Sequence, residues 1–342
     1  MANAAELTCK WCGYRGDAGD FDIRPDGLCF WCPDCDGLTF LNPEDEAGRR
    51  ILLILESGGA SNEVPAPKTG LRKRLSPLRY PGGKSRLIDH IYSRLQQNKM
   101  DTFVELFAGG ASLGLSLLDA GAINTLVLND LDPMIYAFWD SVLHSPGYLM
   151  ARLEKFSPDM SAFLEAKDIL NRASGGDKSI PQDMLAWAFF LLNRTCFGGI
   201  ITGGPLCGKN GQTSELLARW NPKNLVKRLT RILDMAENIQ LYNMDAEQFL
   251  TSTDYWWDDK TTFFVDPPYV KMGDKLYVEK FPEEKHISLA GTLVDLYLSY
   301  PCADVIVTYD DCPLVREIYP VATVECVPRA YSLTPPCVAK AG

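Results

Sequence analysis

The chain has 342 residues, of which 46% are hydrophobic and 23% are charged, a composition typical of a folded protein. This length fits a catalytic domain of about 250 residues with an appendage. The formal net charge of -10 argues against adhesion to nucleic acid over the whole surface, so any such contact must be local. We see no signal peptide and no apolar run long enough to span a bilayer, so we expect a cytoplasmic, intracellular protein without membrane contact.

Residues 1–56 are rich in cysteine and contain two Cys-x-x-Cys pairs. The pairs are Cys9 with Cys12 and Cys32 with Cys35. Four thiolates at this spacing fit a tetrahedral structural Zn²⁺ site in a small zinc-ribbon-like module, and so short a segment needs such a staple to fold. Cys29 offers a competing pair with Cys32, although Pro33 favours Cys32 with Cys35 because it suits a tight turn. The module has few basic residues among several aspartates, so binding a protein partner or a structural role fits at least as well as reading DNA.

Residues 57–74 are predicted to form a linker, since glycine, serine and proline dominate its first part. A run of basic residues without acids begins there and includes Arg72 and Arg74, and residues 219–231 contain a second such run. Both runs are candidates for phosphate contacts with DNA. A linker and a solvated helix face are the competing interpretations.

From residue 75 onward, short apolar strands alternate with amphipathic helices, which predicts a mostly parallel sheet covered on both faces. The expected strands are 102–106, 125–128, 239–242, 262–265 and 304–309, with a last pair from residue 321 onward. Helices are expected to begin near Ser85 and, with Asp132 as N-cap, at Pro133. Helical, basic and glycine-rich stretches interrupt the rhythm between 146 and 237. We therefore predict a Rossmann-like α/β domain over 75–145 and 238–335, with an inserted, mostly helical target-recognition domain over 146–237.

Chemistry is expected beyond the carboxyl ends of the parallel strands, where such sheets bind ligands. The first strand runs into Phe107 and a glycine turn around Gly109, which lets backbone approach a cofactor closely. The second ends at Asp130, which suits binding of ribose hydroxyls but equally suits a second helix cap. Asp245 follows the third strand and can accept from an adenine amine.

The fourth strand ends in a tetrapeptide, Asp266-Pro267-Pro268-Tyr269. This pattern suits methylation of an exocyclic amine of a nucleobase, whose lone pair is delocalised into the ring and must be freed for attack. The Asp266 carboxylate and the Pro267 carbonyl can accept from the amine, the prolines add no competing N–H, and Tyr269 can stack on the base. A turn that only terminates the strand is the competing interpretation. The strand carries no Pro-Cys nucleophile, which excludes a cytosine-C5 methylase.

With these residues the chain resembles the Dam-type DNA adenine methyltransferases, which transfer methyl from S-adenosylmethionine to adenine N6. The resemblance covers roughly residues 75–330 and starts at Leu78-Arg-Tyr-Pro-Gly-Gly-Lys84. It implies a cofactor site made of Tyr80, Lys84, Phe107, Asp130 and Asp245, which Glu105 and Gly109 complete. It also implies that Asn193 and Arg194 lie beside the flipped base and its DNA.

Beyond these motifs, further residues of the sequence agree with the family, and one stretch departs from it. His286 and residues 308–311 fall where the family has recurrent residues, and we expect them to be structural supports. After Gly199 the chain departs from Dam, which leaves the target sequence open.

We therefore predict a site-specific DNA adenine-N6 methyltransferase that acts on double-stranded DNA. The target adenine is expected to be extruded and methylated by direct in-line attack. A cytosine-N4 methylase is the nearest competing hypothesis, because the same acceptors serve that amine. Methylation of RNA or protein is a further hypothesis, as is a non-catalytic DNA-binding protein that keeps the fold.

Overall fold

The computed structural model describes part of the chain. The described residues are 6–9, 12–17, 22–23, 29–35, 38–40, 71, 74–80, 82–95, 101–208, 212–252, 260–270, 281–299, 304–320 and 322–327. Arg72, nearly all of the predicted linker and the segment 41–56 lie outside them.

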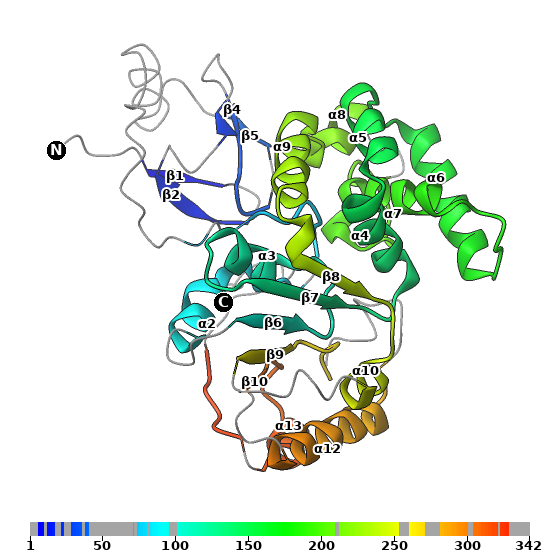
Figure 1. Cartoon of the computed structure of the whole chain (residues 1–342). Coiled ribbons are helices and arrows are strands. Elements are labelled where there is room, and N and C mark those ends of the chain that lie inside the picture. Colours follow the sequence, from blue (N-terminus) through cyan, green and yellow to red (C-terminus); the bar gives the residue numbers. More distant parts are fainter. Residues whose placement is uncertain are drawn as a thin grey trace, which may run out of the picture.

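A five-stranded sheet lies at the centre of the molecule (Figure 1), in the order β10-β9-β6-β7-β8 with all neighbours parallel. Its strands are β6 (Thr102–Glu105), β7 (Thr125–Asn129), β8 (Ile239–Tyr242), β9 (Thr261–Val265) and β10 (Asp304–Val307). These strands confirm the predicted parallel sheet, although β10 ends two residues earlier than expected. The chain places β7 and β8 on one side of β6, and β9 and β10 on the other. The strand order therefore reverses between β6 and β9, at the point where open α/β sheets bind ligands.

The three inner strands of the sheet, β6, β7 and β9, are largely buried and carry apolar side chains on both faces. In β9, Phe263 and Val265 belong to one hydrophobic cluster, whereas Phe264 belongs to the other. In β7, Val127 and Leu128 divide in the same way. Successive side chains of a strand point to opposite faces, so a continuous apolar run fills two cores at once.

Helices cover both faces of this sheet. The larger cluster includes side chains from α2 (Ile88–Leu95), α3 (Ser112–Asp119) and α4 (Pro133–His144). The smaller cluster is covered by α10 (Ala246–Ser252), α12 (Glu283–Ser299) and α13 (Pro313–Ile318), seen below the sheet in Figure 1. Asp132 caps α4 as predicted, because its carboxylate accepts from the Met134 amide at 2.8 Å. The helix expected near Ser85 starts instead as a 3₁₀ turn, η2 (Lys84–Arg86), and α2 follows.

The segment predicted as an inserted domain is helical and lies at one end of the sheet, beyond β8 (Figure 1). Its α-helices are α5 (Pro146–Lys155), α6 (Met160–Ser174), α7 (Gln182–Thr195), α8 (Thr213–Leu216) and α9 (Pro222–Leu233). Shorter 3₁₀ turns are η3 (Phe197–Gly199), η4 (Leu217–Arg219) and η5 (Ala236–Asn238). Its apolar side chains belong to the same cluster as those of β7, so the hydrophobic core is continuous between sheet and helices. The division into domains stays a prediction.

The N-terminal residues form two small antiparallel sheets, drawn beside α9 in Figure 1. One pairs β1 (Glu6–Thr8) with β2 (Arg15–Asp17), and the other contains β3 (Asp22–Ile23), β4 (Cys29–Trp31) and β5 (Leu38–Phe40). At the other end of the chain, the described residues 322–327 form no strand, and the rest of the predicted last pair lies outside the described residues. None of the described helices combines the length and apolar character that a bilayer span requires.

Candidate active site

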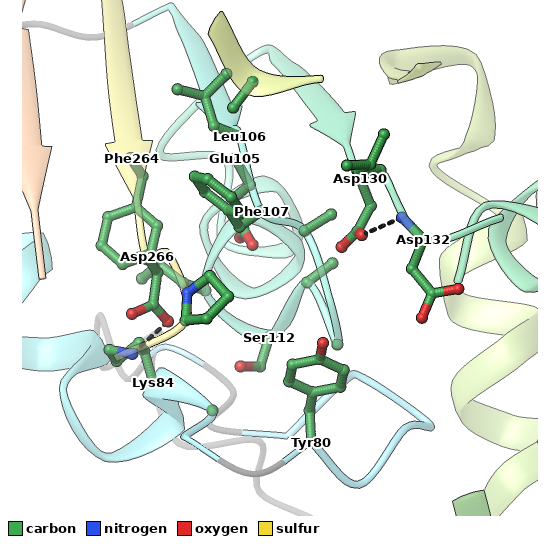
Figure 2. A pocket seen from close by; sticks show the side chains of 18 of the residues that line it. Tyr80, Lys84, Glu105, Leu106, Phe107, Ser112, Asp130, Asp132, Phe264 and Asp266 are labelled. Carbon is green, nitrogen blue, oxygen red and sulfur yellow. Dashed lines mark hydrogen bonds and ion pairs between the residues drawn. The ribbon is translucent and has the colours of Figure 1, made fainter. Parts of the chain in front are cut away.

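A cavity opens at the carboxyl ends of β6, β7 and β9, where the strand order reverses (Figure 2). It encloses about 970 Å³, its open mouth included. Six of the seven residues predicted to bind a cofactor line it: Tyr80, Lys84, Glu105, Phe107, Asp130 and Asp245. Asp266 and Pro268 of the tetrapeptide line the same cavity. The topology therefore brings these residues from five separate segments of the sequence to one site.

The glycine turn after β6 allows Tyr80 to lie directly against the backbone. Gly109 has a φ of +45°, and a Cβ atom there would lie 2.8 Å from Cε1 of Tyr80. The Trp139 indole donates to the Gly109 carbonyl at 2.9 Å and fixes the turn from the other side. A side chain at position 109 would therefore displace the Tyr80 ring.

Asp130 lies at the end of β7 and points into the cavity (Figure 2). Its two carboxylate oxygens accept from the Gly109 amide at 2.8 Å and the Asp132 amide at 3.0 Å. Asp132 itself caps α4, and Asp130 accepts from the amide of this capping residue while its side chain also lines the cavity. Burial raises the pKa of Asp130 to about 7, and the nearby Asp132 charge contributes, although the two amide donors oppose the shift.

Glu105 is a second buried carboxyl group in the cavity wall. It accepts from the Gly114 amide at the start of α3. Gly114 makes room for it, because a Cβ atom there would lie 2.8 Å from Oε1 of Glu105 and 2.3 Å from Cδ1 of Leu126. Burial raises the pKa of Glu105 to about 8, while the Gly114 amide and the Lys84 charge act in the opposite direction.

Asp266 is held by two side chains from other segments. The buried ammonium of Lys84 forms an ion pair with its Oδ2 atom (Figure 2), and the Thr308 hydroxyl donates to Oδ1 at 2.7 Å. Lys84 also donates to the Gly82 carbonyl at 3.0 Å and lies 5.1 Å from the centroid of the Tyr269 ring. The carboxylate therefore has a fixed orientation, with one further lone pair on each oxygen.

The rest of the tetrapeptide packs behind the cavity. Pro267 and Tyr269 are buried, and the Tyr269 ring lies 6.4 Å from that of Tyr309, centroid to centroid. The Tyr309 hydroxyl is 2.9 Å from Nδ1 of His286, and burial lowers the pKa of this histidine. His286 thus packs behind the site, as a structural support would.

Asp245 has a double role at the cavity rim. Its Oδ1 atom caps α10 by accepting from the Glu247 amide at 3.0 Å, while Oδ2 lies 3.4 Å from the Lys285 ammonium. Nearby, the Phe107 ring meets that of Phe281 edge-on, with centroids 5.8 Å apart. An incoming donor at Asp245 would share this carboxylate with the helix cap and the lysine.

Sequence reasoning missed what two residues do for the site. Asn129 ties three strand ends together, because Nδ2 donates to the carbonyls of Leu106 at 3.1 Å and Met244 at 3.0 Å, and Oδ1 accepts from the Met244 amide at 3.1 Å. Thr308, expected only as a general support, bonds Asp266 directly. Thr308 follows Val307, the last residue of β10, and Val307 pairs with Val265, the last residue of β9. Thr308 and Asp266 thus follow the ends of two adjacent parallel strands, so their contact could have been predicted from the strand ends alone.

The four predicted zinc ligands come together in the N-terminal module. The Sγ atoms of Cys9, Cys12, Cys32 and Cys35 all lie within 4.8 Å of one another. Cys9 and Cys35 are 3.5 Å apart and Cys12 and Cys32 are 3.7 Å apart, close to the edge of about 3.8 Å expected for a tetrahedron with Zn–S bonds of about 2.3 Å. The first knuckle turns at Gly13, whose φ is +72°. This arrangement suits a tetrahedral metal ion, and the side chain of Cys29 lies outside the described residues.

The family profile of the D12 class N6 adenine-specific DNA methyltransferases matches residues 80–329, well over half of the chain. The chain belongs to this family. The match runs from Tyr80 past the tetrapeptide and leaves the cysteine module outside.

Two relatives of this D12-class methyltransferase carry related names. The chain is 24% identical over 204 residues to modification methylase LlaI of Lactococcus lactis subsp. lactis. This alignment covers 59% of this chain and 31% of the relative. The chain is also 36% identical over 85 residues to type II methyltransferase M.FokI of Planomicrobium okeanokoites. This second alignment covers 24% of this chain and 12% of the relative. Each match thus spans less than a third of the relative's length.

Asn193 and Arg194, which the sequence assigned to DNA binding, are buried at the end of α7 of the methyltransferase. Asn193 accepts from the Arg79 amide and donates to the Arg79 carbonyl, both at 2.8 Å. Arg194 donates to the carbonyls of Arg219 at 3.0 Å and Pro77 at 3.2 Å. With exposed fractions of 1% and 0%, neither side chain reaches the surface for a direct DNA contact in this structure.

Several basic side chains of the two predicted runs, among those that the structure describes, bond to other parts of the protein. Arg74 forms an ion pair with Asp34, and Arg228 of α9 is buried, donating to the Ser76 carbonyl at 3.1 Å. Arg231 pairs with Asp119. Within α9, Lys223 and Lys227 are the exposed basic residues. The electrostatic surface offered to DNA by this part of the methyltransferase is therefore smaller than the sequence suggested.

Proposed function

We propose that this methyltransferase transfers the methyl group of S-adenosylmethionine to N6 of an adenine in double-stranded DNA. The observation that carries the proposal is the cavity that Asp266 and Asp130 line together. One carboxylate suits a nucleobase amine and the other suits the ribose of a nucleoside cofactor. The family description and the names of the two relatives support the same activity.

The cavity has features that fit a nucleoside cofactor. Each oxygen of Asp130 keeps a lone pair for a ribose hydroxyl, beyond those used by the backbone amides. The Asp245 carboxylate offers an acceptor for the adenine amine, and Tyr80 and Phe107 offer aromatic surfaces in the cavity wall. The glycine turn lets backbone lie close to the ligand, as in other nucleotide folds. When bound, S-adenosylmethionine supplies a methyl group made electrophilic by its sulfonium sulfur.

Asp266 would orient and activate the amine. Its carboxylate and the Pro267 carbonyl accept the two N6 hydrogens, which turns the nitrogen lone pair toward the methyl group. As the new N–C bond forms and the S–C bond breaks, positive charge develops on N6, and the fixed negative charge of Asp266 stabilises it. Lys84 and Thr308 hold the carboxylate in place, so little reorganisation is needed.

The target adenine must leave the duplex to reach this cavity. Phe197 is 65% exposed on η3, next to Cys196, whose carbonyl accepts from the Arg79 guanidinium at 3.0 Å. An exposed aromatic ring at this place is suited to stack on an unstacked base. Lys223 and Lys227 are the exposed cations of α9 that would contact phosphates.

We also propose that the four-cysteine cluster binds a structural Zn²⁺ ion. Four thiolates at tetrahedral spacing are the donor set that this ion prefers. Elemental analysis of the purified protein, with Cys9→Ser as comparison, tests this proposal. A metal content near one equivalent that is lost in the variant is expected, and equal zinc in both would contradict it.

The activity is tested by incubating the protein with S-adenosylmethionine and mixed-sequence duplex DNA, then identifying methylated nucleosides by mass spectrometry. N6-methyladenine is expected with the wild type and absent with Asp266→Ala. Asp295→Ala is the matched control, because Asp295 is an exposed carboxylate on α12 and does not line the cavity. Cofactor binding by Asp266→Ala, measured by calorimetry, shows that the variant is folded.

Different products would change the assignment. N4-methylcytosine would move the enzyme to the cytosine-amine class, since the acceptors are the same. Absence of any methylated nucleoside, with the cofactor bound, would refute DNA methylation by the isolated protein and favour an RNA substrate or a non-catalytic DNA-binding role.

A further inference from the structure

Segment 74–80 connects the cysteine module to the cavity. It begins beside the module at Arg74 and ends at Tyr80 in the cavity wall. Side chains of α7 and α9 hold its backbone between these ends: Arg228 donates to the Ser76 carbonyl at 3.1 Å, Arg194 to the Pro77 carbonyl at 3.2 Å, and Asn193 bonds both backbone groups of Arg79 at 2.8 Å. Because these bonds leave the segment little freedom, a displacement of Arg74 at one end would shift Tyr80 at the other.

The connection to the cluster is the ion pair between Arg74 and Asp34. Asp34 is 7% exposed and lies between two of the cysteines, and its amide donates to Sγ of Cys32 at 3.2 Å. Because Asp34 lies between Cys32 and Cys35, the position of its carboxylate would depend on the turn that these two cysteines would form around a metal ion. Arg74 is thus anchored to the geometry of the metal site.

A buried residue of η4 fixes the middle of the segment. Arg219 is 7% exposed, and its carbonyl accepts from Nε of Arg194 at 3.0 Å. Arg194 in turn donates to the Pro77 carbonyl at 3.2 Å. Arg194 therefore ties the segment to η4.

At the cavity end of the segment, Tyr80 has little room to move. The Tyr80 ring lies so close to the turn after β6 that a Cβ atom at Gly109 would approach it to 2.8 Å. Tyr80 also lines the cavity opposite the acidic groups seen in Figure 2. A shift of Tyr80 by a fraction of an ångström would alter both the turn and the cavity wall.

We propose that the metal-loaded cysteine module is a positioning element of the methylation site. It holds segment 74–80 so that Tyr80 stands where cofactor binding requires it. Four thiolates around a divalent ion would leave two negative charges next to the Arg74–Asp34 ion pair, and loss of the ion would remove the bonds that hold the Cys32–Cys35 turn in place. This inference rests on the proposed function, because it assigns the cavity to S-adenosylmethionine.

The test uses the full-length, zinc-loaded protein and the variants Arg74→Ala and Arg74→Lys. Calorimetry without DNA measures S-adenosylmethionine affinity, hydrogen–deuterium exchange reports the Leu78 and Arg79 amides, and elemental analysis reports zinc. These amides are protected by acceptors at 3.2 Å on Ser76 and 2.8 Å on Asn193. In Arg74→Ala we expect retained zinc, faster exchange and about five- to tenfold weaker cofactor binding, within the usual range of coupling between sites.

The matched variants separate this link from a general loss of charge. Arg74→Lys keeps a cation opposite Asp34 and should recover most of the affinity. Arg172→Ala removes a guanidinium of similar type that is 51% exposed and pairs with Asp177, and it should bind the cofactor like the wild type. Removing zinc from the wild type with a chelator should weaken cofactor binding by a similar factor, and restoring zinc should reverse the loss.

Three results would overturn the inference. The first is unchanged exchange at Leu78 and Arg79 in both Arg74→Ala and the zinc-free protein, and the second is faster exchange with unchanged cofactor affinity. The third is an equal loss of affinity in Arg172→Ala. If the wild type itself fails to bind S-adenosylmethionine, the cofactor assignment of the proposed function is refuted, and the exchange measurement still decides whether the module positions segment 74–80.

Discussion

The raised pKa of Asp130 predicts that cofactor affinity depends steeply on pH near neutrality. The two ribose hydroxyls require acceptors, and the ionised carboxylate provides them best, whereas the protonated form turns one oxygen into a donor. Burial raises the pKa of this group to about 7. The fraction of protein ready to bind should therefore fall as the pH drops through 7.

The magnitude follows from the ionised fraction. With a pKa of about 7, the carboxyl is ionised in about nine tenths of the molecules at pH 8 and in about one tenth at pH 6. Because an apparent Kd is the intrinsic value divided by the competent fraction, S-adenosylmethionine should bind about tenfold more weakly at pH 6 than at pH 8. Binding favours the carboxylate, so it should also release protons at pH 7.

The folding stability of the cofactor-free protein should depend on pH in the opposite direction to the cofactor affinity. The folded-state pKa of Asp130 lies above its ordinary value of 3.8, so the folded protein binds protons more readily than the unfolded chain. The resulting stability is fully present below about pH 4 and is lost as the pH rises through about 7. In this respect Asp130 makes the ligand-free protein less stable under the conditions where the site is ready to bind.

Calorimetric titrations from pH 6 to pH 8, in buffers of different ionisation enthalpy, measure both the affinity and the protons released. Asp130→Asn should bind weakly at every pH and lose the dependence. Glu105→Gln is the necessary control, because the pKa of Glu105 is raised to about 8 and it titrates in the same range. Persistence of the tenfold change in Asp130→Asn, or its disappearance in Glu105→Gln alone, would refute the assignment to Asp130.

Three further substitutions test separate parts of the site. Gly109→Ala places a methyl group 2.8 Å from the Tyr80 ring at a φ of +45°, so calorimetry should show cofactor binding weakened by about tenfold or more. Thr308→Val removes the 2.7 Å bond to Asp266, and we expect about a tenfold lower single-turnover rate with cofactor affinity unchanged; a change in affinity alone would contradict the positioning role. Phe197→Ala removes a ring that is 65% exposed, so it should leave the melting temperature unchanged and reduce methylation of duplex DNA by about tenfold, with a smaller loss when the target adenine is mispaired and already unstacked.

The positions of the cavity residues were predictable because they follow from local rules. Each parallel strand is a short apolar run, and the polar residue that follows it lies at one edge of the sheet. Asp130 and Asp266 were placed by this rule, and both line the cavity. The capping pattern Asp132-Pro133 was equally local and was confirmed at α4.

The contacts between distant segments could not be predicted in the same way. Asn193 and Arg194 are polar and close α7, which suggested an exposed edge beside DNA. In the structure every residue from Ala186 to Thr195 is buried, so even its polar end is enclosed and bonds to backbone carbonyls. Nothing in the sequence indicates which carbonyls lie within reach, because those of Pro77 and Arg79 belong to a segment more than a hundred residues earlier.

The charge inside the cavity gives a physical reason for its raised pKa values. Five carboxyl groups line the cavity, and the one lysine in its lining, Lys84, forms an ion pair with Asp266; the carboxyl groups are those of Glu105, Asp130, Asp132, Asp245 and Asp266. Burying unbalanced carboxyl groups is unfavourable, and the pKa values of Glu105 and Asp130 rise to about 8 and about 7 as a result. A ligand that brings positive charge into the cavity, as a sulfonium cofactor does, restores the balance and favours the ionised forms. The same imbalance that lowers the stability of the ligand-free protein would thus favour a charged cofactor over its neutral thioether product, so exchange of product for fresh cofactor should be most favourable where Asp130 is ionised.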